Sequence, residues 1–252
     1  MSYNNKKKER AEEAQWHTRY MDENYKEQTI ESIKRTKIYE KDVELGNRTI
    51  TRIDQISVVP MDSVSAIFKY AKDSRAMVLN FASYRHAGGN FINGSRAQEE
   101  SLCLESNLYN ILKEHQSFYD ENSKHPNKSL YTNRALYTKK VVFLRDFKTQ
   151  YCDVLTCASP NYHAASSKVS KEENTKALKD RIKFVIKIAL NNNVDTLILG
   201  AFGCGVFGQD PIEVASIFKE VIGKYCNRGL RIVFAIPEGN NDNLDAFRKV
   251  FS

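Results

Sequence analysis

The chain has 252 residues, 41% of them hydrophobic and 27% charged, which is the composition of a globular protein able to bury a core. It has no run of about 18 apolar residues, and its first twenty residues are too polar for a signal-peptide core. We therefore expect a cytoplasmic protein without a membrane partner. The net charge of +7 is dispersed, since the basic run Lys6–Lys8 is followed at once by Glu9, and it singles out no polyanionic ligand.

Cysteine spacing argues against two further classes of protein. The five cysteines stand far apart, with no Cys-x-x-Cys pair and no histidine at ligand spacing. Such spacing supports neither a disulfide framework nor a zinc site. We expect no metal, no cofactor, and reduced thiols at Cys103, Cys152, Cys157, Cys204 and Cys226.

Helix-forming residues dominate the beginning of the chain. Residues 7–38 carry apolar anchors, among them Trp16 and Ile30, along one or two expected helices. We interpret residues 1–48 as an N-terminal helical extension and residues 49–252 as the main domain.

From residue 49 onward, strand and helix patterns alternate. The expected strands cover 48–59, 75–80, 136–146, 151–161, 195–202 and 231–238. The expected helices cover 61–73, 97–115, 171–193 and 210–226, and a long excursion covers 116–139. Alternation of this kind predicts an α/β fold in which helices cover both faces of a mixed, largely parallel sheet.

The stretch LILGAFGCGVFGQDPIEVASIF contains three glycines, Gly203, Gly205 and Gly208, at G-x-G-x-x-G spacing between an expected strand and helix. A dinucleotide-binding dehydrogenase would place this pattern on its first strand, with an acid roughly 20 residues later. Here one strand follows, and Glu238 at its end lies about 30 residues away. Free backbone amides at a helix start still suit a diphosphate, although a turn without a ligand would show the same glycines.

A second glycine-rich segment, NFASYRHAGGNFINGSRAQEE, follows the strand that ends at Asn80. Ligands of α/β sheets gather at the carboxyl ends of strands, so this loop and the 203–208 loop should face one crevice. Gly88-Gly89 would permit close backbone approach, and Gln98-Glu99-Glu100 would occupy the first turn of the next helix. Acids at that position could equally serve only to oppose the helix dipole.

Residues 80–109 resemble the signature of the bacterial-type poly(ADP-ribose) glycohydrolases, a branch of the macrodomain superfamily, in which Asn-Phe-Ala-Ser leads through three glycines to Gln-Glu-Glu. Further stretches resemble the family in its order: PMDSVSAIF with Asp62, FLRD at 143–146, TCASPN at 156–161, LGAFGCGVFGQDPIEVA at 199–215 and VFAIPE at 233–238. The resemblance spans residues 49–251 and implies a three-layer α/β/α macrodomain. Asn90 departs from it, because the family has its third glycine there.

The resemblance implies a hydrolase that cleaves the ribose–ribose O-glycosidic bond of poly(ADP-ribose) and releases ADP-ribose. Glu100 would be the general acid and base, protonating the departing oxygen and then activating water, while Glu99 would orient the ribose. Asn80 would bind a ribose hydroxyl, the 203–207 loop the diphosphate, and Phe207 the distal ribose. The full set of implied ligand contacts is Asn80, Ala82, Gly88, Gly89, Asn90, Gln98, Asn161, Gly203, Cys204, Gly205, Val206, Phe207 and Gly208.

Several alternatives stay open at this point. Asn90 could crowd the ribose and leave an ADP-ribose reader without turnover, and the basic charge is compatible with removal of single ADP-ribose units from protein or nucleic acid. Phe207 could be a core residue and Asn161 a turn residue. His86 and Cys204 lack partners that would make them catalytic. The expected partners are ADP-ribose, its polymer and ADP-ribosylated macromolecules, with nucleic acid only as a modified substrate, and the expected state is a monomer.

Overall fold

A computed structural model describes residues 3–40, 44, 53–72, 74–225, 230–239 and 242–252. Their centre is a seven-stranded sheet in the order β1-β4-β5-β3-β6-β7-β2. The strands are β1 (Lys37–Glu40), β2 (Ile53–Val59), β3 (Ala76–Phe81), β4 (Arg134–Arg145), β5 (Lys148–Cys157), β6 (Thr196–Leu199) and β7 (Leu230–Ala235). β5, β3, β6, β7 and β2 run parallel, whereas β4 and β1 are antiparallel to their neighbours. The expected mixed, largely parallel sheet is confirmed.

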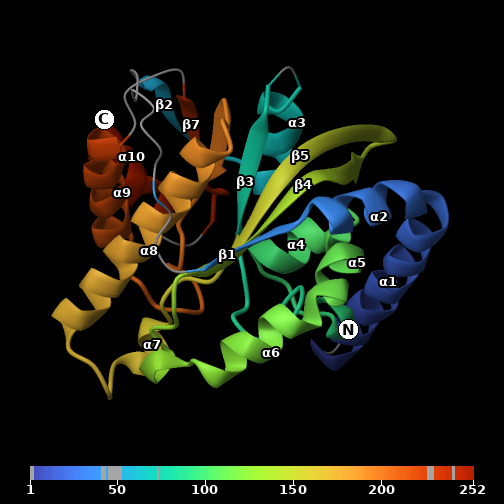
Figure 1. Cartoon of the computed structure of the whole chain (residues 1–252), viewed down its shortest axis with the longest axis horizontal. Helices are drawn as coiled ribbons and strands as arrows, with labels where there is room; N and C mark the ends of the chain where they lie inside the picture. Colours follow the sequence, from blue (N-terminus) through green and yellow to red (C-terminus); the bar gives the residue numbers. More distant parts are fainter. Residues whose placement is uncertain (1–2, 41–43, 45–52, 73, 226–229, 240–241) are drawn as a thin grey trace.

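Helices cover both faces of this sheet (Figure 1). One face carries α8 (Lys171–Asn191), α9 (Pro211–Tyr225) and α10 (Asn243–Phe251). The other carries α3 (Ser63–Tyr70), α4 (Gln98–Leu104), α5 (Leu108–Leu112) and α6 (Gln116–Lys124). Short pieces connect them: η1 (Phe91–Asn93), η2 (Lys113–His115), η3 (Asn127–Ser129) and α7 (Tyr162–Ala165). The three-layer α/β/α prediction is therefore confirmed.

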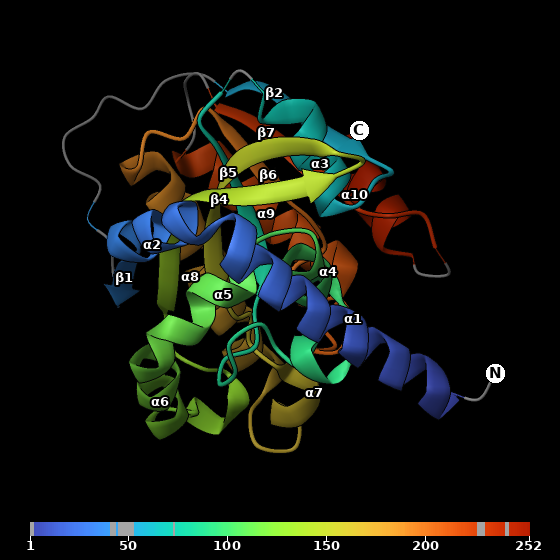
Figure 2. The same ribbon diagram turned by 90° about the vertical axis from the view of Figure 1, so that its right-hand side faces the viewer.

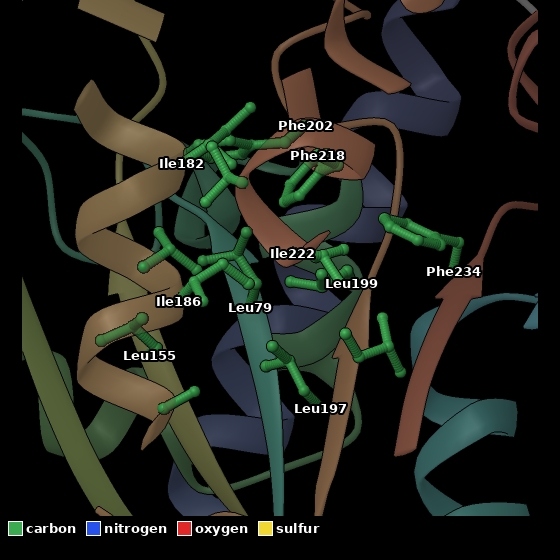
Figure 3. Packing of buried hydrophobic residues seen from close by; sticks show 14 of the residues in the cluster. Leu79, Leu155, Ile182, Ile186, Leu197, Leu199, Phe202, Phe218, Ile222 and Phe234 are labelled. Carbon is green, nitrogen blue, oxygen red and sulfur yellow. The ribbon is translucent and has the colours of Figure 1, made fainter. Parts of the chain in front are cut away.

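The period-2 pattern of β3 assigns its side chains to these two layers. Met77 and Leu79 join the core under α8 and α9, and Val78 joins the core under α3 and α4. Figure 3 shows the first core, in which Leu79 and Leu155 from the sheet lie against Ile182 and Ile186 of α8. Burial of β3 on both faces explains its uninterrupted apolar run.

The N-terminal segment forms α1 (Tyr3–Asn24), α2 (Lys26–Arg35) and then β1, which pairs with β4 at the sheet edge. α1 lies across α5 and beside η1 on the outside of the α3–α6 layer (Figure 2). The helical extension is thus present, and a short strand that the sequence reading did not predict ties it to the sheet. The proposed boundary at residues 48 and 49, like the start of the 48–59 strand and Cys226, lies outside the described residues.

The expected helix over 97–115 is interrupted between α4 and α5. Asn107 N donates to Val142 O and Leu144 N donates to Glu105 O, so the backbone at the interruption bonds to β4 rather than to its own helix. Ser106 Oγ donates to Leu102 O at 2.6 Å and completes the end of α4. The excursion over 116–139 contains α6 and η3, and α10 was not predicted at all. Because of the interruption, α4 is a short, separate helix that packs against the central strand β3.

Candidate active site

A cavity of about 810 Å³ opens at the carboxyl ends of the parallel strands. Its walls come from the loops after β3, β5, β6 and β7 and from the start of α4. The two glycine-rich segments identified in the sequence therefore meet at one cavity, as predicted. β3 lies between β5 and β6, so its loop enters the cavity centrally.

Glu99 lies at the floor of this cavity, 3% exposed, in the first turn of α4. Its Oε2 accepts a 2.7 Å hydrogen bond from Ser83 N, and its Oε1 accepts a 3.1 Å bond from Asn80 Nδ2. Burial raises the pKa of the Glu99 carboxyl to about 8, against the opposing effect of these two donors. Glu99 is thus held by Asn80 at the end of β3 and by Ser83 at the start of the following loop, and its raised pKa favours the protonated form at neutral pH.

Glu100 is the second buried carboxyl of the pair, at 9% exposure. Its Oε1 accepts a 3.1 Å hydrogen bond from Asn90 N, and the side chain lines the cavity. Both side-chain oxygens of Glu99 accept hydrogen bonds from the protein, whereas the one hydrogen bond described for Glu100 is accepted by Oε1. The pair is therefore asymmetric, and Glu100 is the better placed of the two to exchange a proton with a ligand.

The glycines ahead of α4 are needed for close approach to these acids. Gly88 and Gly89 both have φ of 64°, a backbone conformation that residues other than glycine rarely adopt. A Cβ on Gly89 would lie 2.7 Å from Glu100 Oε1 and 3.0 Å from Glu99 Oε2, while one on Gly88 would meet the Tyr109 ring. Glycine at 89 thus leaves room for both carboxylates.

Asn90 does not occupy a glycine-like position. Its φ is −118°, so the backbone at this position does not adopt the positive φ that would favour glycine. Its Nδ2 donates to Ser95 Oγ at 2.9 Å, and its Oδ1 accepts from Asn93 Nδ2 at 2.8 Å. The side chain is bound within its own loop, whereas Gly89 lines the cavity.

Gln98 fastens the start of α4 to the end of β3. Its Oε1 accepts from Phe81 N at 2.9 Å, and its Nε2 donates to Leu79 O and Ser63 Oγ. Both ends of the amide therefore have protein partners, although the residue lines the cavity. Asn80, fully buried beside it, donates to Thr156 Oγ1 as well as to Glu99, and its Oδ1 is buried without a hydrogen-bond partner.

The 203–208 loop forms the opposite wall. Gly203 and Gly208 have φ of 82° and 68°, and a Cβ on Gly203 would lie 2.2 Å from Ser159 Oγ. Gln209 anchors the loop: its side chain exchanges two hydrogen bonds with Asn174 of α8 and donates to Pro160 O. Gly205 has no atom within 4 Å of an added Cβ, and its neighbour Val206 is 82% exposed. The loop is rigid at its ends and open at its tip.

An aromatic row borders this wall. Tyr84 stacks on Tyr131 with centroids 4.1 Å apart, and Tyr131 meets Phe207 edge-on at 6.1 Å. All three line the cavity, and Phe207 is half-buried rather than a core residue. The sequence reading missed Tyr84 and Tyr131. The signal was weak, since Tyr131 belongs to a stretch without helix or strand periodicity.

Four other predicted residues take varied places. Ala82 lines the cavity, and its N–H bonds to Asn80 O and Cys157 O. Asn161 caps α7 by accepting from Ala164 N, the structural role held open for it. Burial raises the pKa of the Cys204 thiol to about 12, which opposes a nucleophilic role. His86 is exposed at the cavity edge, and its backbone N–H donates to Ser83 Oγ.

Arg145 supports α4 from behind. It binds the carboxylates of Asp62 and Glu105 and donates to Ser65 Oγ at 2.6 Å. Asp62 is the N-cap of α3, and Glu105 follows the last residue of α4. Burial works to raise the pKa of Asp62, but the hydrogen bonds from Arg145 and Ser65 outweigh it and lower that pKa to about 2. This ion-pair cluster ties together the helices on either side of the cavity floor.

Comparisons with known proteins identify the family. Residues 9–146 match the family model described as the catalytic domain of microbial-type PARG, which is more than half of the chain. The chain belongs to this family. The match includes the Asn80 segment and both glutamates of α4, and the 203–208 loop lies beyond it.

Solved structures extend the similarity of this microbial-type PARG domain over nearly the whole chain. The poly(ADP-ribose) glycohydrolase of Deinococcus radiodurans, as a mutant in complex with ADP-ribose, is 26% identical over 89% of this chain and 97% of its own, with a TM-score of 0.80. The enzyme of Thermomonospora curvata, bound to the inhibitor ADP-HPD, is 27% identical over 88% of this chain and 87% of its own, with a TM-score of 0.74. No curated protein sequence matches the chain.

The described residues of this PARG domain contain neither a metal-ligand cluster nor a membrane-spanning helix. None of the described His, Cys, Asp and Glu side chains form a group of three or more that could hold a metal ion. No helix in the described part is both long and apolar enough to cross a membrane.

Proposed function

We propose that the chain is a hydrolase that cleaves the ribose–ribose O-glycosidic bond of poly(ADP-ribose) and releases ADP-ribose. The observation that carries the proposal is the asymmetric pair Glu99 and Glu100, buried together at the floor of a cavity large enough for a nucleotide. Membership of the microbial-type PARG family supports the same substrate class.

Glu100 is the proposed general acid and base. An O-glycosidic bond breaks through an oxocarbenium-like state, so the departing oxygen needs a proton, and the carboxylate left behind can accept one from water. The Asn90 N–H, at 3.1 Å from Oε1, fixes the carboxyl while the rest of the group faces the cavity. A single carboxyl would serve both steps, since both oxygens of Glu99 bond to the protein.

Glu99 and Asn80 are the proposed ribose-binding groups. A protonated Glu99 can donate a hydrogen bond to a ribose hydroxyl, and its raised pKa keeps it protonated at neutral pH. Asn80 Oδ1, buried without a partner, is a ready acceptor beside it.

The 203–208 loop is the proposed diphosphate site, and the aromatic row is the proposed contact for the sugar and base. The positive φ angles at Gly203 and Gly208 and the open space at Gly205 allow backbone amides to approach phosphate oxygens. Phe207 and Tyr131 offer ring faces and edges at the same wall. Gly88, Gly89 and Ala82 are the proposed backbone contacts on the other side.

A protein that binds ADP-ribose without cleaving it is the second candidate. It was motivated by possible crowding of the ribose by Asn90, and this motivation weakens because the Asn90 side chain bonds to Ser95 and Asn93. Removal of single ADP-ribose units gains no specific support from the cavity. The two-part division of the chain, the monomeric state and the cytoplasmic location stay predictions.

The deciding experiment incubates the protein with poly- and mono-ADP-ribosylated substrates and identifies the products. Release of ADP-ribose from polymer supports the proposal, and Glu100→Gln should lower that release at least about a thousandfold while ADP-ribose affinity changes little. Glu23→Gln, an exposed glutamate of α1, is the matched control. Binding without cleavage of any substrate would favour the reader, and undiminished release by Glu100→Gln would remove Glu100 from its role.

A further inference from the structure

Arg181 is a fully buried guanidinium whose partners are all neutral. It lies in α8 at 1% exposure, and its Nε donates to Asn133 Oδ1 at 2.7 Å. Its other donors reach the backbone carbonyls of Ala158 and Leu130. These acceptors give each of its three nitrogens one hydrogen bond but do not neutralise its charge.

No carboxylate of the described residues forms an ion pair with Arg181. Cys157 lies nearby, yet burial raises the pKa of its thiol to about 11, so it stays neutral. Arg145 shows how a partly buried arginine is usually neutralised, because it forms ion pairs with two carboxylates although it is less buried than Arg181. Burying a cation without an opposite charge costs free energy, so the burial of Arg181 points to a counter-charge supplied by a bound ligand.

The position of Arg181 indicates where that charge would come from. Arg181 bonds to the carbonyl of Ala158, and the next residue, Ser159, lines the cavity. Ser159 also packs closely against Gly203, because a Cβ added to Gly203 would lie 2.2 Å from Ser159 Oγ. The carbonyl of Leu130 precedes Tyr131, another cavity residue. The guanidinium thus bonds to the backbone beside two residues that line the cavity, one of which packs against Gly203 of the 203–208 loop.

We propose that Arg181 acts through the cavity wall as an electrostatic positioning residue, with the diphosphate of the ligand as its missing counter-charge. The inference rests on the ADP-ribose ligand of the proposed function. The attraction between a buried cation and the charge of a ligand is poorly screened, because the protein interior has a lower effective dielectric constant than water. The backbone amides of the loop then fix the phosphate oxygens, while Arg181 lowers the free energy of the doubly negative ligand without touching it.

A purely structural clamp would make a different prediction. If Arg181 only holds the 130–133 and 158–160 segments, its loss would weaken every ligand of the cavity to a similar extent. If its charge matters, the loss would fall on phosphate-bearing ligands and spare neutral ones. The two roles are therefore distinguished by comparing the affinities for charged and neutral ligands, and not by measuring the stability of the variants.

The experiment compares Arg181→Gln, Arg181→Met and Arg181→Lys in the full chain, using ADP-ribose and neutral adenosine as probes. ADP-ribose affinity is measured by calorimetry and adenosine by NMR titration. Arg75→Gln is the control, since it removes an exposed arginine at the opposite end of β3. We expect Arg181→Gln and Arg181→Met to lose about tenfold in ADP-ribose affinity and less than about twofold for adenosine, with Arg181→Lys close to wild type.

Equal losses for both ligands, or no loss in Arg181→Gln relative to Arg75→Gln, would overturn the inference. If Arg181→Met does not fold, the contrast between the Gln and Lys variants still decides, because only the latter keeps the charge. The measurement uses binding alone. A wild-type chain that binds ADP-ribose without cutting polymer would contradict the hydrolase proposal and leave this inference standing, and one that does not bind ADP-ribose would contradict both.

Discussion

The backbone N–H of Asn90 donates a 3.1 Å hydrogen bond to Glu100 Oε1, so the residue that departs from the family's three glycines supports the proposed acid through its main chain. The side chain of Asn90 points instead to Ser95 and Asn93. The contact to Glu100 therefore does not depend on which side chain stands at position 90.

Asn90→Gly should consequently leave turnover within about threefold of wild type. The variant keeps the N–H that holds Glu100 and loses two side-chain hydrogen bonds of the loop, at a cost of about 1–2 kcal/mol in unfolding free energy. Steady-state kinetics and urea unfolding measure the two effects. A large acceleration would show that the Asn90 side chain hinders the substrate after all.

Gly89→Ala tests the close approach beside the acids. The new methyl group would lie 2.7 Å from Glu100 Oε1, and alanine at φ of 64° is strained, so we expect at least about a hundredfold loss of turnover. Gly223→Ala in α9 is the matched control, because an added Cβ there meets no atom within 4 Å, its φ is not positive, and it lies away from the cavity lining. Equal kinetics in the two variants would mean that the 89 position does not constrain Glu100.

The Glu99 carboxyl should make the protein less stable as the pH rises. Its pKa is about 8 in the folded chain and near the ordinary 4.5 when unfolded, so the folded state holds more protons between these values. The stability from this group is present below about pH 4.5 and is lost as the pH rises toward 8, a difference on the order of a few kcal/mol.

Glu99→Gln removes this titration, and its amide oxygen can still accept from Ser83 N, although its amide nitrogen cannot replace the oxygen that accepts from Asn80 Nδ2. Urea unfolding at pH 5 and pH 8.5 should show wild type losing stability relative to the variant across that interval, with Glu23→Gln behaving as wild type. Parallel pH profiles of wild type and Glu99→Gln would contradict the raised pKa.

The sequence carried enough information for the architecture because its strands are buried on both faces and its glycines sit at strand ends. β3, β6 and β7 each read as short apolar runs, and the loops after β3 and β6 converge because parallel strands end at one edge. β1 and α10 were missed since short or terminal elements carry little periodicity and depend on tertiary contacts, as the pairing of β1 with β4 shows.

Within the site, residue types could be predicted but not their partners. Glu99 and Glu100 are adjacent in sequence and chemically identical, and only the positions of Ser83, Asn80 and Asn90 distinguish them. Arg181 carried no signal, because an arginine in an amphipathic helix is normally exposed. Its burial depends on where the 130–133 segment passes, which no local pattern reveals.

Arg10 connects the N-terminal helix α1 to the loop that holds the proposed acid Glu100. Its Nε donates to Gly94 O at 2.8 Å, and a Cβ on Gly94 would lie 2.2 Å from Lys7 O, so α1 packs directly against the loop that holds Glu100. Gly94 N in turn bonds to Phe91 O, one residue from Asn90. Loss of the Arg10 contact should loosen residues 90–95 by about 1 kcal/mol.

We therefore expect Arg10→Ala to speed amide hydrogen exchange in residues 90–95 and to lower kcat by about three- to tenfold with a smaller change in KM. Arg19→Ala, which removes an exposed arginine from the same helix, should change neither. Arg10→Lys should restore part of the effect, since an ammonium can still reach a carbonyl oxygen. If Arg10→Ala and Arg19→Ala give the same exchange rates and the same kcat, the Arg10 hydrogen bond does not support the loop, because the two variants share every change except the loss of that bond.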